Sequence, residues 1–389
     1  MKPRTDDHTL NQLEASGLRG RGGGWFETYR KWCAVLAEDG RPLVIANGGE
    51  GEPGSIKDRF VMRARPKDVL LGLKIAMDVL GAERGYVYLR GSFGIEEELL
   101  RKALQDLGLA SIVSLHRGDD SYVGGEETAL LESIEGRTAW PRPKPPRPSA
   151  VGLFGRPTLV QNVDTLARVP GAVNEGSAFA ATETLTLTLW GDVRSPGAYE
   201  VRTNRALRDV IDTEGGGATS PVGLVFPSGV QSMPLTPAQL DVELKPAAIE
   251  ALGSALGTAS ILVLGEDTSW PSIVDAVARF FERESCGQCP PCVLGARNLR
   301  GLIAGDRPSA NRLTPHSAIR ETAAFMSMHG YCSHSRAGAD AVTGLFTRWQ
   351  GEIIERLRGV PTRPGARERD PFAPEAAERR ALDDFLNLM

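Results

Sequence analysis

The sequence predicts a multidomain α/β protein that ends in a helical part. Strand-like apolar runs alternate with amphipathic helical stretches in the N-terminal third, an alternating strand starts at Thr184, and helical periodicity dominates from Ser269. A length of 389 residues is enough for two or three domains, each with its own core. The expected domains are 1–178, 179–266 and 267–360, followed by a tail, 361–389.

Composition and charge exclude several classes of protein. Hydrophobic residues make up 41% of the chain and charged residues 24%, as in ordinary globular proteins. A net charge of -4 gives no reason to expect nucleic-acid binding. The start of the chain is polar, and no apolar run approaches membrane-spanning length. We therefore expect a cytoplasmic protein, with peripheral attachment to the inner face of a membrane through a partner as the alternative.

The first informative segment is glycine-rich and basic and spans residues 17–26. Closely spaced glycines let the backbone approach a ligand, and their freed N–H groups can form an anion cradle. Arg19, Arg21 and Lys31 add positive charge beside a phosphate. The segment is neither a Walker loop nor a dinucleotide fingerprint after a clear strand. A plain glycine-rich surface loop is the alternative.

A predicted buried strand, Leu43–Ala46, runs directly into the polar loop 47–59. Ligands of open α/β sheets bind beyond the carboxyl ends of strands, so Asn47, Glu50 and Glu52 are placed to contact one. A solvated acidic turn is the alternative. A helix over 67–80, a strand over 85–89 and a helix over 95–107 are predicted to follow.

Residues 121–128 place two glycines before paired carboxylates at the start of a predicted helix, 128–134. One interpretation is that Gly125 admits a flat cofactor while Glu126 or Glu127 binds its polar edge. The other is that the acids only complement the positive end of the helix dipole.

Two further polar segments follow before the second domain. The proline-rich stretch 140–148 must be extended, and it either holds Lys144 near a ligand or is a plain connection. After it, the polar residues Gln161, Asn162 and Thr165 stand at the start of an apolar helix.

The middle of the chain predicts a small α+β unit. An alternating strand over 184–190 is followed by a turn-rich hairpin connection, a short helix over 206–212 and an apolar strand over 261–264. It shows no cluster of reactive residue types, so we expect a structural spacer or a docking surface.

Four of the five cysteines form the pattern that carries most information. Cys286, Cys289 and Cys292 are spaced by two residues, and Cys332 follows forty residues later. A C-x2-C-x2-C run with a fourth cysteine can ligate a [4Fe–4S] cluster. Structural zinc and disulfides are the alternatives, but zinc ligands usually come as separated pairs. The fifth cysteine, Cys33, is expected to be a buried structural thiol.

The C-terminal part predicts four helices around these cysteines. The first begins near Ser269 and ends near Glu284, which leaves the three cysteines in a loop that two prolines, Pro290 and Pro291, would rigidify. A helix over 293–303 and two helices within 317–356, with Cys332 between them, complete the set. An amphipathic stretch, 375–388, would pack onto a partner or onto the chain itself, or stay mobile.

Taken in order, these segments resemble the flavoprotein subunit of respiratory complex I and the related subunits of NAD-linked hydrogenases and formate dehydrogenases. The resemblance covers roughly residues 16–355 and includes the cysteine spacing. It implies a Rossmann-like α/β FMN domain, then a ubiquitin-like β-grasp domain, then a C-terminal four-helix bundle. A runner-up family, the flavin subunit of membrane ion-pumping ferredoxin–NAD oxidoreductases, carries paired ferredoxin-type cysteine runs that are absent here.

The resemblance also implies the site residues and cofactors. The residues implied for FMN are Gly20, Arg21, Gly22, Lys31, Asn47, Glu50, Gly125, Glu126, Asn162 and Thr165. Those implied for NADH are Phe26, Glu52, Glu127 and Lys144. The implied ligands of the [4Fe–4S] cluster are Cys286, Cys289, Cys292 and Cys332.

The chain departs from the family pattern mainly around the nucleotide. Gly49 stands where the family has an aspartate, and Arg147 and Ala34 stand at two positions that are usually aromatic. Each lost aromatic would remove about 1–2 kcal/mol of contact with the adenine. Trp25 and Tyr29 put bulk where the family keeps glycine.

The implied function is an electron-transfer subunit that oxidises NAD(P)H through FMN and passes electrons via [4Fe–4S] to a partner. That partner would be a ferredoxin-like or [2Fe–2S] protein, or a subunit of a membrane complex. The alternatives are an FMN and cluster relay that does not bind NAD(P)H, and a scaffold that has lost its cofactors. Arg147 would favour NADPH by pairing with its phosphate.

Overall fold

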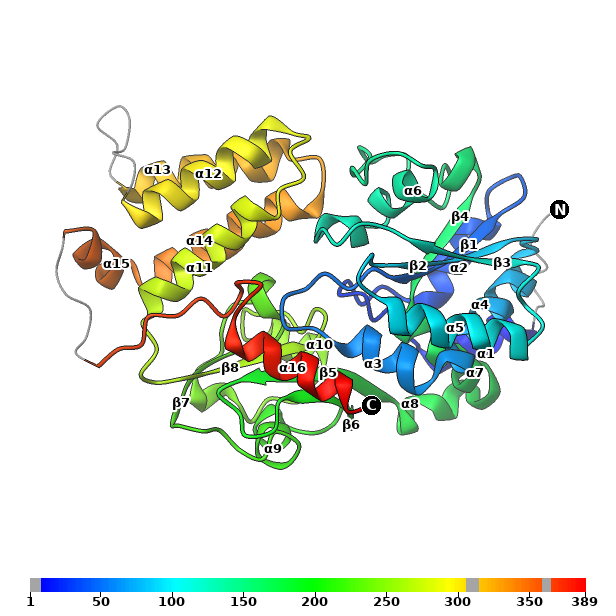
Figure 1. Cartoon of the computed structure of the whole chain (residues 1–389), viewed down its shortest axis with the longest axis horizontal. Helices are drawn as coiled ribbons and strands as arrows, with labels where there is room; N and C mark the ends of the chain where they lie inside the picture. The colour runs from blue at the N-terminus through cyan, green and yellow to red at the C-terminus, as the bar shows by residue number, and fades with distance from the viewer. Residues whose placement is uncertain (1–7, 306–314, 359–364) are drawn as a thin grey trace.

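The computed structural model describes residues 8–305, 315–358 and 365–389. Figure 1 shows an α/β unit at one end of the long axis, a second sheet in the middle and a group of long helices at the other end. The predicted mixed α/β fold is confirmed, including a parallel sheet in its N-terminal part.

The first sheet has the strand order β3-β2-β1-β4, and every pair is parallel. Its strands are β1 (Leu43–Gly48), β2 (Gly85–Leu89), β3 (Val113–Arg117) and β4 (Thr158–Asn162). Parallel strands need crossover connections, which helices supply here, so β1, β2 and β4 are buried along most of their length, whereas in the edge strand β3 only Val113 is buried. The carboxyl ends of β1 and β4 lie side by side, with Asn47 opposite Asn162.

Helices cover the two faces of this sheet unequally. Side chains alternate along β1, so Val44 and Ala46 enter a core that they share with Leu70 and Leu73, while Leu43 and Ile45 enter a smaller core with Leu130. The helices of this unit are α1 (His8–Ser16), α2 (Thr28–Leu36), α3 (Lys57–Ala64), α4 (Pro66–Leu80), α5 (Gly94–Asp106), α6 (Ala129–Ile134), α7 (Val163–Glu175) and α8 (Phe179–Thr182).

The second sheet is mixed, with the order β6-β5-β8-β7. Its strands are β5 (Thr184–Gly191), β6 (Gly197–Arg202), β7 (Val222–Phe226) and β8 (Ser260–Gly265), and its helices are α9 (Leu207–Thr213) and α10 (Pro246–Glu250). β5 is parallel to β8, and the outer pairs are antiparallel. One face packs on α9 and α10, while the other carries Trp190 and Leu262 into a core shared with the long helices.

The long helices are α11 (Trp270–Arg283), α12 (Pro290–Ala304), α13 (Pro315–His329) and α14 (Ser333–Arg348), followed by the shorter α15 (Gln350–Leu357). The segment after 317 therefore holds three helices rather than the predicted two, and Cys332 lies between α13 and α14 as predicted. The predicted start of the second helix at residue 293 was wrong. Pro290 and Pro291 form the first positions of α12 instead of stiffening a loop, because proline suits the first helical turn.

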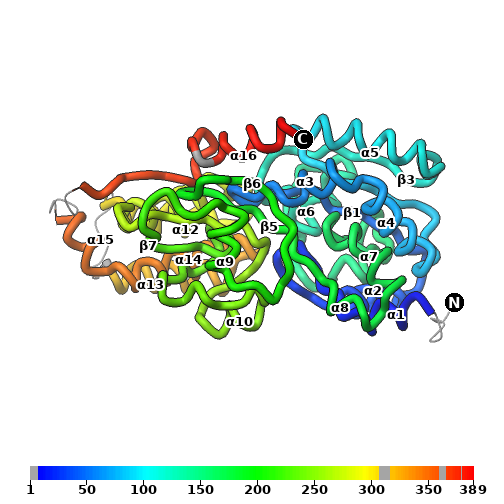
Figure 2. Tube along the Cα trace, turned by 90° about the horizontal axis from the view of Figure 1, so that it is seen from below, coloured from blue at the N-terminus to red at the C-terminus, as the bar shows by residue number. Residues whose placement is uncertain are grey.

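The C-terminal segment packs back onto the chain, one of the three outcomes considered for it. Helix α16 (Ala377–Asn387) lies against β5 and β6, and Figure 2 shows it running along the molecule towards α3. Asp383 pairs with Arg59 at 3.2 Å, which ties this helix to the first unit. None of the described helices is both long and apolar enough to cross a bilayer.

Candidate functional site

A cavity of about 430 Å³ opens at the carboxyl ends of β1 and β4. This is where an open α/β sheet binds its ligands. Its walls come from all three parts of the fold: the glycine-rich loop, the loop after β1, the turn before α6, two turns of the second sheet and the residues that follow Cys332. The implied site residues among them are Gly22, Asn47, Glu50, Glu52, Gly125, Glu126, Asn162 and Cys332.

The remaining implied residues do not line the cavity. They are Gly20, Arg21, Lys31, Thr165, Phe26, Glu127, Lys144, Cys286, Cys289 and Cys292. Trp25 and Tyr29 are also absent from the walls, so their bulk does not fill the space.

Asn47 joins two loops that come together at the floor of the cavity. Its Nδ2 donates to the carbonyl oxygen of Gly125 at 2.9 Å, and its Oδ1 accepts from the backbone N–H of Gly49 at 2.9 Å. A Cβ on Gly49 would lie 3.0 Å from the Cα of Gly125, and one on Gly125 would collide with the Gly49 carbonyl. The chain therefore needs glycine at position 125, and a larger residue at position 49 would require its neighbours to shift by a few tenths of an ångström, which gives a physical reason for Gly49 in place of the family's aspartate.

Glu50 organises the start of α3. Its Oε1 accepts from the hydroxyl of Ser55 at 2.6 Å and from the backbone N–H of Asp58 at 3.1 Å, as in a helix N-terminal cap. Asp58 is buried, pairs with the buried Lys57, and accepts from Nδ2 of Asn162 at 2.8 Å. Burial raises the pKa of Asp58 to about 7 against the opposing effect of Lys57.

The glycine-rich loop lines the cavity with its backbone, and the side chain of Arg21 does not line the cavity. Gly22, Gly23 and Gly24 line the space. The backbone N–H of Arg21 donates to Oγ1 of Thr165 at 2.8 Å, which anchors the loop on α7. The Arg21 guanidinium is buried and pairs with Glu183, and this burial, together with Arg168, lowers its pKa to about 10.

The paired carboxylates before α6 have different surroundings. Oε2 of Glu126 accepts from the backbone N–H groups of Thr128 at 2.8 Å and Ala129 at 3.0 Å, so this residue does stabilise the helix start. Its Oε1 accepts from Lys144 at 2.6 Å. Glu127 lies between Lys144 at 2.9 Å and Lys31 at 3.4 Å. Burial opposes ionisation of Glu127, but the two ammonium groups lower its pKa.

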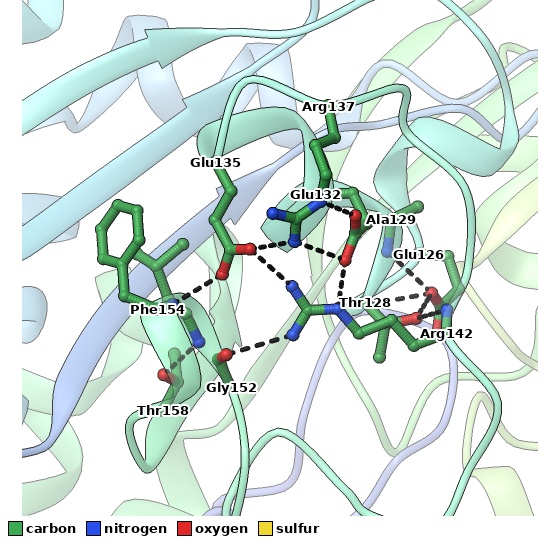
Figure 3. Close-up of polar contacts among 11 residues, drawn as sticks. Glu126, Thr128, Ala129, Glu132, Glu135, Arg137, Arg142, Gly152, Phe154 and Thr158 are labelled. Carbon is green, nitrogen blue, oxygen red and sulfur yellow. Dashed lines mark hydrogen bonds and ion pairs between the residues drawn. The ribbon is translucent and has the colours of Figure 1, made fainter.

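The extended stretch 137–148 holds Lys144 in place because it is anchored upstream. Arg142 pairs with Glu132 and, at 3.0 Å, with Glu135, and it donates to the carbonyl of Gly152 at 3.1 Å. Figure 3 shows these contacts together with those of Arg137, which pairs with the same two glutamates.

Glu52 and Phe26, both implied for NADH, occupy opposite environments. Phe26 is 57% exposed. Glu52 is buried and accepts from the backbone N–H of Val230 at 3.0 Å, the hydroxyl of Tyr122 at 3.2 Å and Nε2 of Gln231 at 3.3 Å. Burial raises the pKa of Glu52 to about 8, although these three hydrogen bonds oppose the shift.

Several cavity residues were missed by sequence reasoning. Lys57 and Asp58 stood in the polar loop 47–59, where two adjacent charges after an apolar residue were the available signal. Tyr122, Gln231 and His334 had no such signal, since only the tertiary fold brings them to the cavity.

The four cysteines of the pattern gather at the end of the helical part. Cys286 lies in the loop after α11, Cys289 is the N-terminal cap of α12, and Cys292 lies in its first turn, so the predicted loop holds only part of the triplet. Burial and the neighbouring thiols raise the pKa of Cys292 to about 12, and burial raises that of Cys332 to about 11. Cys33 is half-buried rather than buried as expected.

The arrangement of these thiols bears on the choice between zinc and a cluster. Within the described ranges, no three His, Cys, Asp or Glu side chains converge closely enough to hold one metal ion. The other three thiols nevertheless lie near enough to raise the pKa of Cys292. A polynuclear cluster, in which each cysteine binds a different iron, fits a wider cage of thiols better than tetrahedral zinc does.

Comparisons with known proteins agree with this geometry. A family model described as the Nuo51 FMN-binding domain matches residues 13–171, and one described as the NADH-ubiquinone oxidoreductase-F iron-sulfur binding region matches 272–356. An F subunit of the NADH-quinone oxidoreductase of Rhizobium meliloti (strain 1021) is 36% identical over 78% of this chain and 78% of its own length. The F subunit of the NADH-quinone oxidoreductase of Rhodobacter capsulatus is 33% identical over 92% of this chain and 89% of its own.

Solved structures show the same relationship. A chain of an NAD⁺-reducing [NiFe]-hydrogenase in the air-oxidized state superposes with a TM-score of 0.79 at 29% identity, over 98% of this chain and 67% of the other. The resemblance to this family, with its FMN and [4Fe–4S] cofactors, is thereby confirmed. The chain belongs to the family of NADH-quinone oxidoreductase F subunits, as an electron-transfer protein with an FMN-binding domain and a 4Fe–4S region.

Proposed function

We propose that FMN binds in the cavity described above, takes electrons from NAD(P)H, and is followed by one [4Fe–4S] cluster on the four cysteines. A single observation carries this proposal. The cavity that is lined by Gly22, Asn47 and Gly125 is also lined by Cys332 and His334. A flavin held there would lie beside the cluster, with no further carrier needed between them.

The residues present suit a flat, polar cofactor. Gly49 packs its backbone against Gly125, and Gly22, Gly23 and Gly24 line the cavity without side chains, so this wall presents backbone to the cofactor. Asn47, Asn162 and Glu126 offer amide and carboxylate groups to its edge. When bound, FMN accepts a hydride and can release the electrons singly.

The nucleotide would bind at the outer rim of the cavity. Phe26 is exposed and offers a ring for stacking, while Lys144 and Glu127 form an ion pair whose polar groups can exchange partners with a ribose or an amide. Glu52 would act differently from the family expectation. It accepts hydrogen bonds from Val230 and Gln231 of the second unit and so positions the cavity wall rather than the nucleotide.

The alternative is an FMN and cluster relay that does not bind NAD(P)H. It is favoured by one observation, the engagement of Glu52 within the fold, together with the two missing aromatics of the nucleotide site. Under this alternative a ferredoxin-like or membrane redox protein would deliver the electrons.

A partner redox protein would dock at the end of the helical part. Four large apolar side chains are exposed there: Leu294 at 58%, Phe325 at 46%, Met328 at 72% and Tyr331 at 48%. Leu294 follows Cys292 by two residues and Tyr331 precedes Cys332, so a partner on this surface would lie next to the cluster. A ferredoxin-like or [2Fe–2S] protein would suit this role, and through such a partner the chain would attach to the inner face of a membrane.

We also propose that the three units correspond to the Rossmann-like, β-grasp and four-helix-bundle domains, with boundaries near residues 178, 266 and 360. Separate cores on the first sheet and beneath α9 support the first boundary. The second boundary is less distinct, because one core joins the second sheet, the long helices and the C-terminal segment.

An anaerobic titration tests the function. Protein loaded with FMN and reconstituted with iron and sulfide is titrated with NADH and, separately, with NADPH, while the flavin absorption is followed. Bleaching by either nucleotide is the expected result. Bleaching by dithionite but by neither nucleotide would support the relay, and failure to take up flavin or iron would support the scaffold.

A further inference from the structure

Trp25 has a backbone conformation that tryptophan rarely adopts. Its φ is 48°, in the left-handed region that favours glycine. A bulky residue keeps this conformation only where its surroundings determine it. The contacts of the Trp25 side chain therefore indicate the role of this residue.

The indole of Trp25 joins the first unit to the second. Its Nε1–H donates to the carbonyl oxygen of Gly257 at 2.8 Å, and its ring packs against the core beneath α9. The guanidinium of Arg21 lies over the ring, 4.4 Å from its centroid. The ring is thus held between a buried cation of its own loop and the turn 255–258 of the second unit.

Both segments joined by this indole line the cavity. Gly22, Gly23 and Gly24 come from the loop of Trp25, and Ala255, Gly257 and Thr258 come from the opposite turn. An added Cβ on Gly23 would already lie 3.5 Å from Cγ2 of Thr258.

Each of the two segments is internally braced, so a shift of one end moves the whole segment. In the loop, the Gly20 N–H donates to the Phe26 carbonyl at 2.8 Å and the Thr28 N–H to the Leu18 carbonyl at 3.0 Å. In the turn, the Ala259 N–H donates to the Leu256 carbonyl at 2.7 Å, and the Thr258 N–H donates to Oγ of Ser228, outside the turn, at 2.9 Å. The contacts of the indole therefore fix the distance between the glycine-rich loop and the turn 255–258.

We propose that Trp25 is a positioning residue that holds the glycine-rich loop against the turn 255–258 and thereby helps to retain FMN. The inference rests on the proposed flavin site. Trp25 lies outside the cavity, at a position where the family keeps glycine. Its side chain stabilises the walls of the flavin site and does not fill the site.

Two substitutions separate the contributions of the ring and the hydrogen bond. Trp25→Phe keeps a ring beside Arg21 and loses the N–H donor, while Trp25→Gly removes both and relieves the backbone. Val210→Ala, a buried residue of α9 in the same core, is the matched control because it lowers stability without touching either wall. Each protein, with its cluster reconstituted, is depleted of flavin and titrated with FMN, with flavin fluorescence, the FMN dissociation rate and the melting temperature as readouts.

The FMN dissociation constant is expected to rise about three- to tenfold in Trp25→Phe, in line with one lost hydrogen bond, and further in Trp25→Gly. Faster FMN release accounts for the rise, and Val210→Ala keeps the wild-type constant although it melts earlier. The inference is overturned if both Trp25 variants bind FMN as the wild type does, or if Val210→Ala loses as much affinity. If Trp25→Gly does not fold, the comparison of Trp25→Phe with the wild type tests the inference. A wild-type protein that binds no FMN would instead overturn the proposed function itself.

Discussion

Glu52 is the residue whose structure differs most from its expected role. The family resemblance implies that Glu52 contacts NADH. In the structure its carboxyl is buried against Val230, Gln231 and Tyr122, and no cation is among the groups that shift its pKa. A buried carboxyl with three donors and no opposite charge keeps its proton to a higher pH than an exposed one. Its protonation is therefore coupled to the contact between the first and second units.

This coupling predicts a pH dependence of stability. The pKa of Glu52 rises from 4.5 to about 8 on folding, so the folded chain holds a proton that the unfolded chain has released. The free energy of unfolding should fall as the pH rises through this window, by up to about 5 kcal/mol. Glu52→Gln cannot ionise, so its stability relative to the wild type should increase from pH 4.5 to 8.

Denaturant unfolding at a series of pH values measures the difference. The control is Glu83→Gln, whose side chain is 67% exposed and should leave the profile unchanged. Parallel profiles for Glu52→Gln and the wild type would show that the Glu52 carboxyl is ionised in the folded protein.

At the level of single residues, the strand pattern predicted the position of Asn47, because a ligand of a parallel sheet binds beyond the carboxyl ends of its strands. Asn162 lies beside it at the end of β4, a strand that the sequence did not predict, so its place in the site was implied only by the family resemblance. The sequence could not predict that Glu52 would face the second unit, or that Tyr122 and His334 would meet in the cavity. Those positions depend on how the units pack, which has no periodic signature in the chain.

Among the elements, α4 and α7 pack closely against each other in the first unit. Gly72 of α4 lies against the backbone of Leu166 in α7, and an added Cβ would collide with the Leu166 carbonyl. Backbone cannot yield as a flexible side chain does. The packing of α4 against α7 therefore requires a residue without a side chain at position 72.

Gly72→Ala should destabilise the protein by about 2–3 kcal/mol or more, because one helix must move away from the other. Gly351→Ala in α15 is the matched control, since nothing lies within 4 Å of its added Cβ. That change should be neutral or stabilise by about 0.5–1 kcal/mol. Equal midpoints of chemical unfolding for the two variants would contradict the account.

The stretch 137–148 gives a functional prediction at the same scale. Arg142→Ala removes the pairing with Glu132 and Glu135, so Lys144 should lose its fixed place while Arg137 still neutralises both glutamates. The KM for NADH should rise about two- to fivefold with little change in kcat. Steady-state rates with an artificial acceptor measure both constants.

Arg41→Ala is the control for this variant, because Arg41 is 78% exposed and pairs with Glu83 away from the cavity. An unchanged KM in Arg142→Ala would mean that Lys144 is held without the upstream anchor, or does not contact the nucleotide.

Most helices and strands could be predicted because their apolar periodicity is strong. The strands at 43–46, 85–89 and 261–264 and the helix at 67–80 were found within about two residues of their ends. The start of α12 was misjudged because two prolines between cysteines suggested a loop, whereas proline is also favoured in a first helical turn. β3, β4, β6 and β7 were not identified, because their patterns are short or weak.

For the whole molecule, the C-terminal segment joins parts that are distant in sequence. Phe372 is fully buried in edge contacts with Trp190 of β5 and Phe226 of β7. Leu382 and Leu386 of α16 enter the same core. The polar composition of the tail gave no way to choose between this packing and the alternatives, because its few apolar residues have partners only once the second sheet has formed.

Phe372→Ala should therefore lower the free energy of unfolding by about 3–5 kcal/mol, since it leaves a cavity in the shared core. Phe325→Ala removes the same atoms from a side chain that is 46% exposed, and should cost less than about 1 kcal/mol. If the two variants unfold at the same denaturant concentration, the C-terminal segment does not contribute to the shared core in solution.

The central claim is that electrons from a nicotinamide nucleotide reach a cluster held by Cys286, Cys289, Cys292 and Cys332 through a flavin in the adjoining cavity. Electron paramagnetic resonance at low temperature, on protein loaded with both cofactors and frozen after anaerobic addition of NADH or NADPH, tests it directly. We expect a reduced-cluster signal that is absent from Cys332→Ala, while the FMN of that variant is still reduced. A wild-type protein whose cluster is reduced by dithionite but by neither nucleotide would contradict the account.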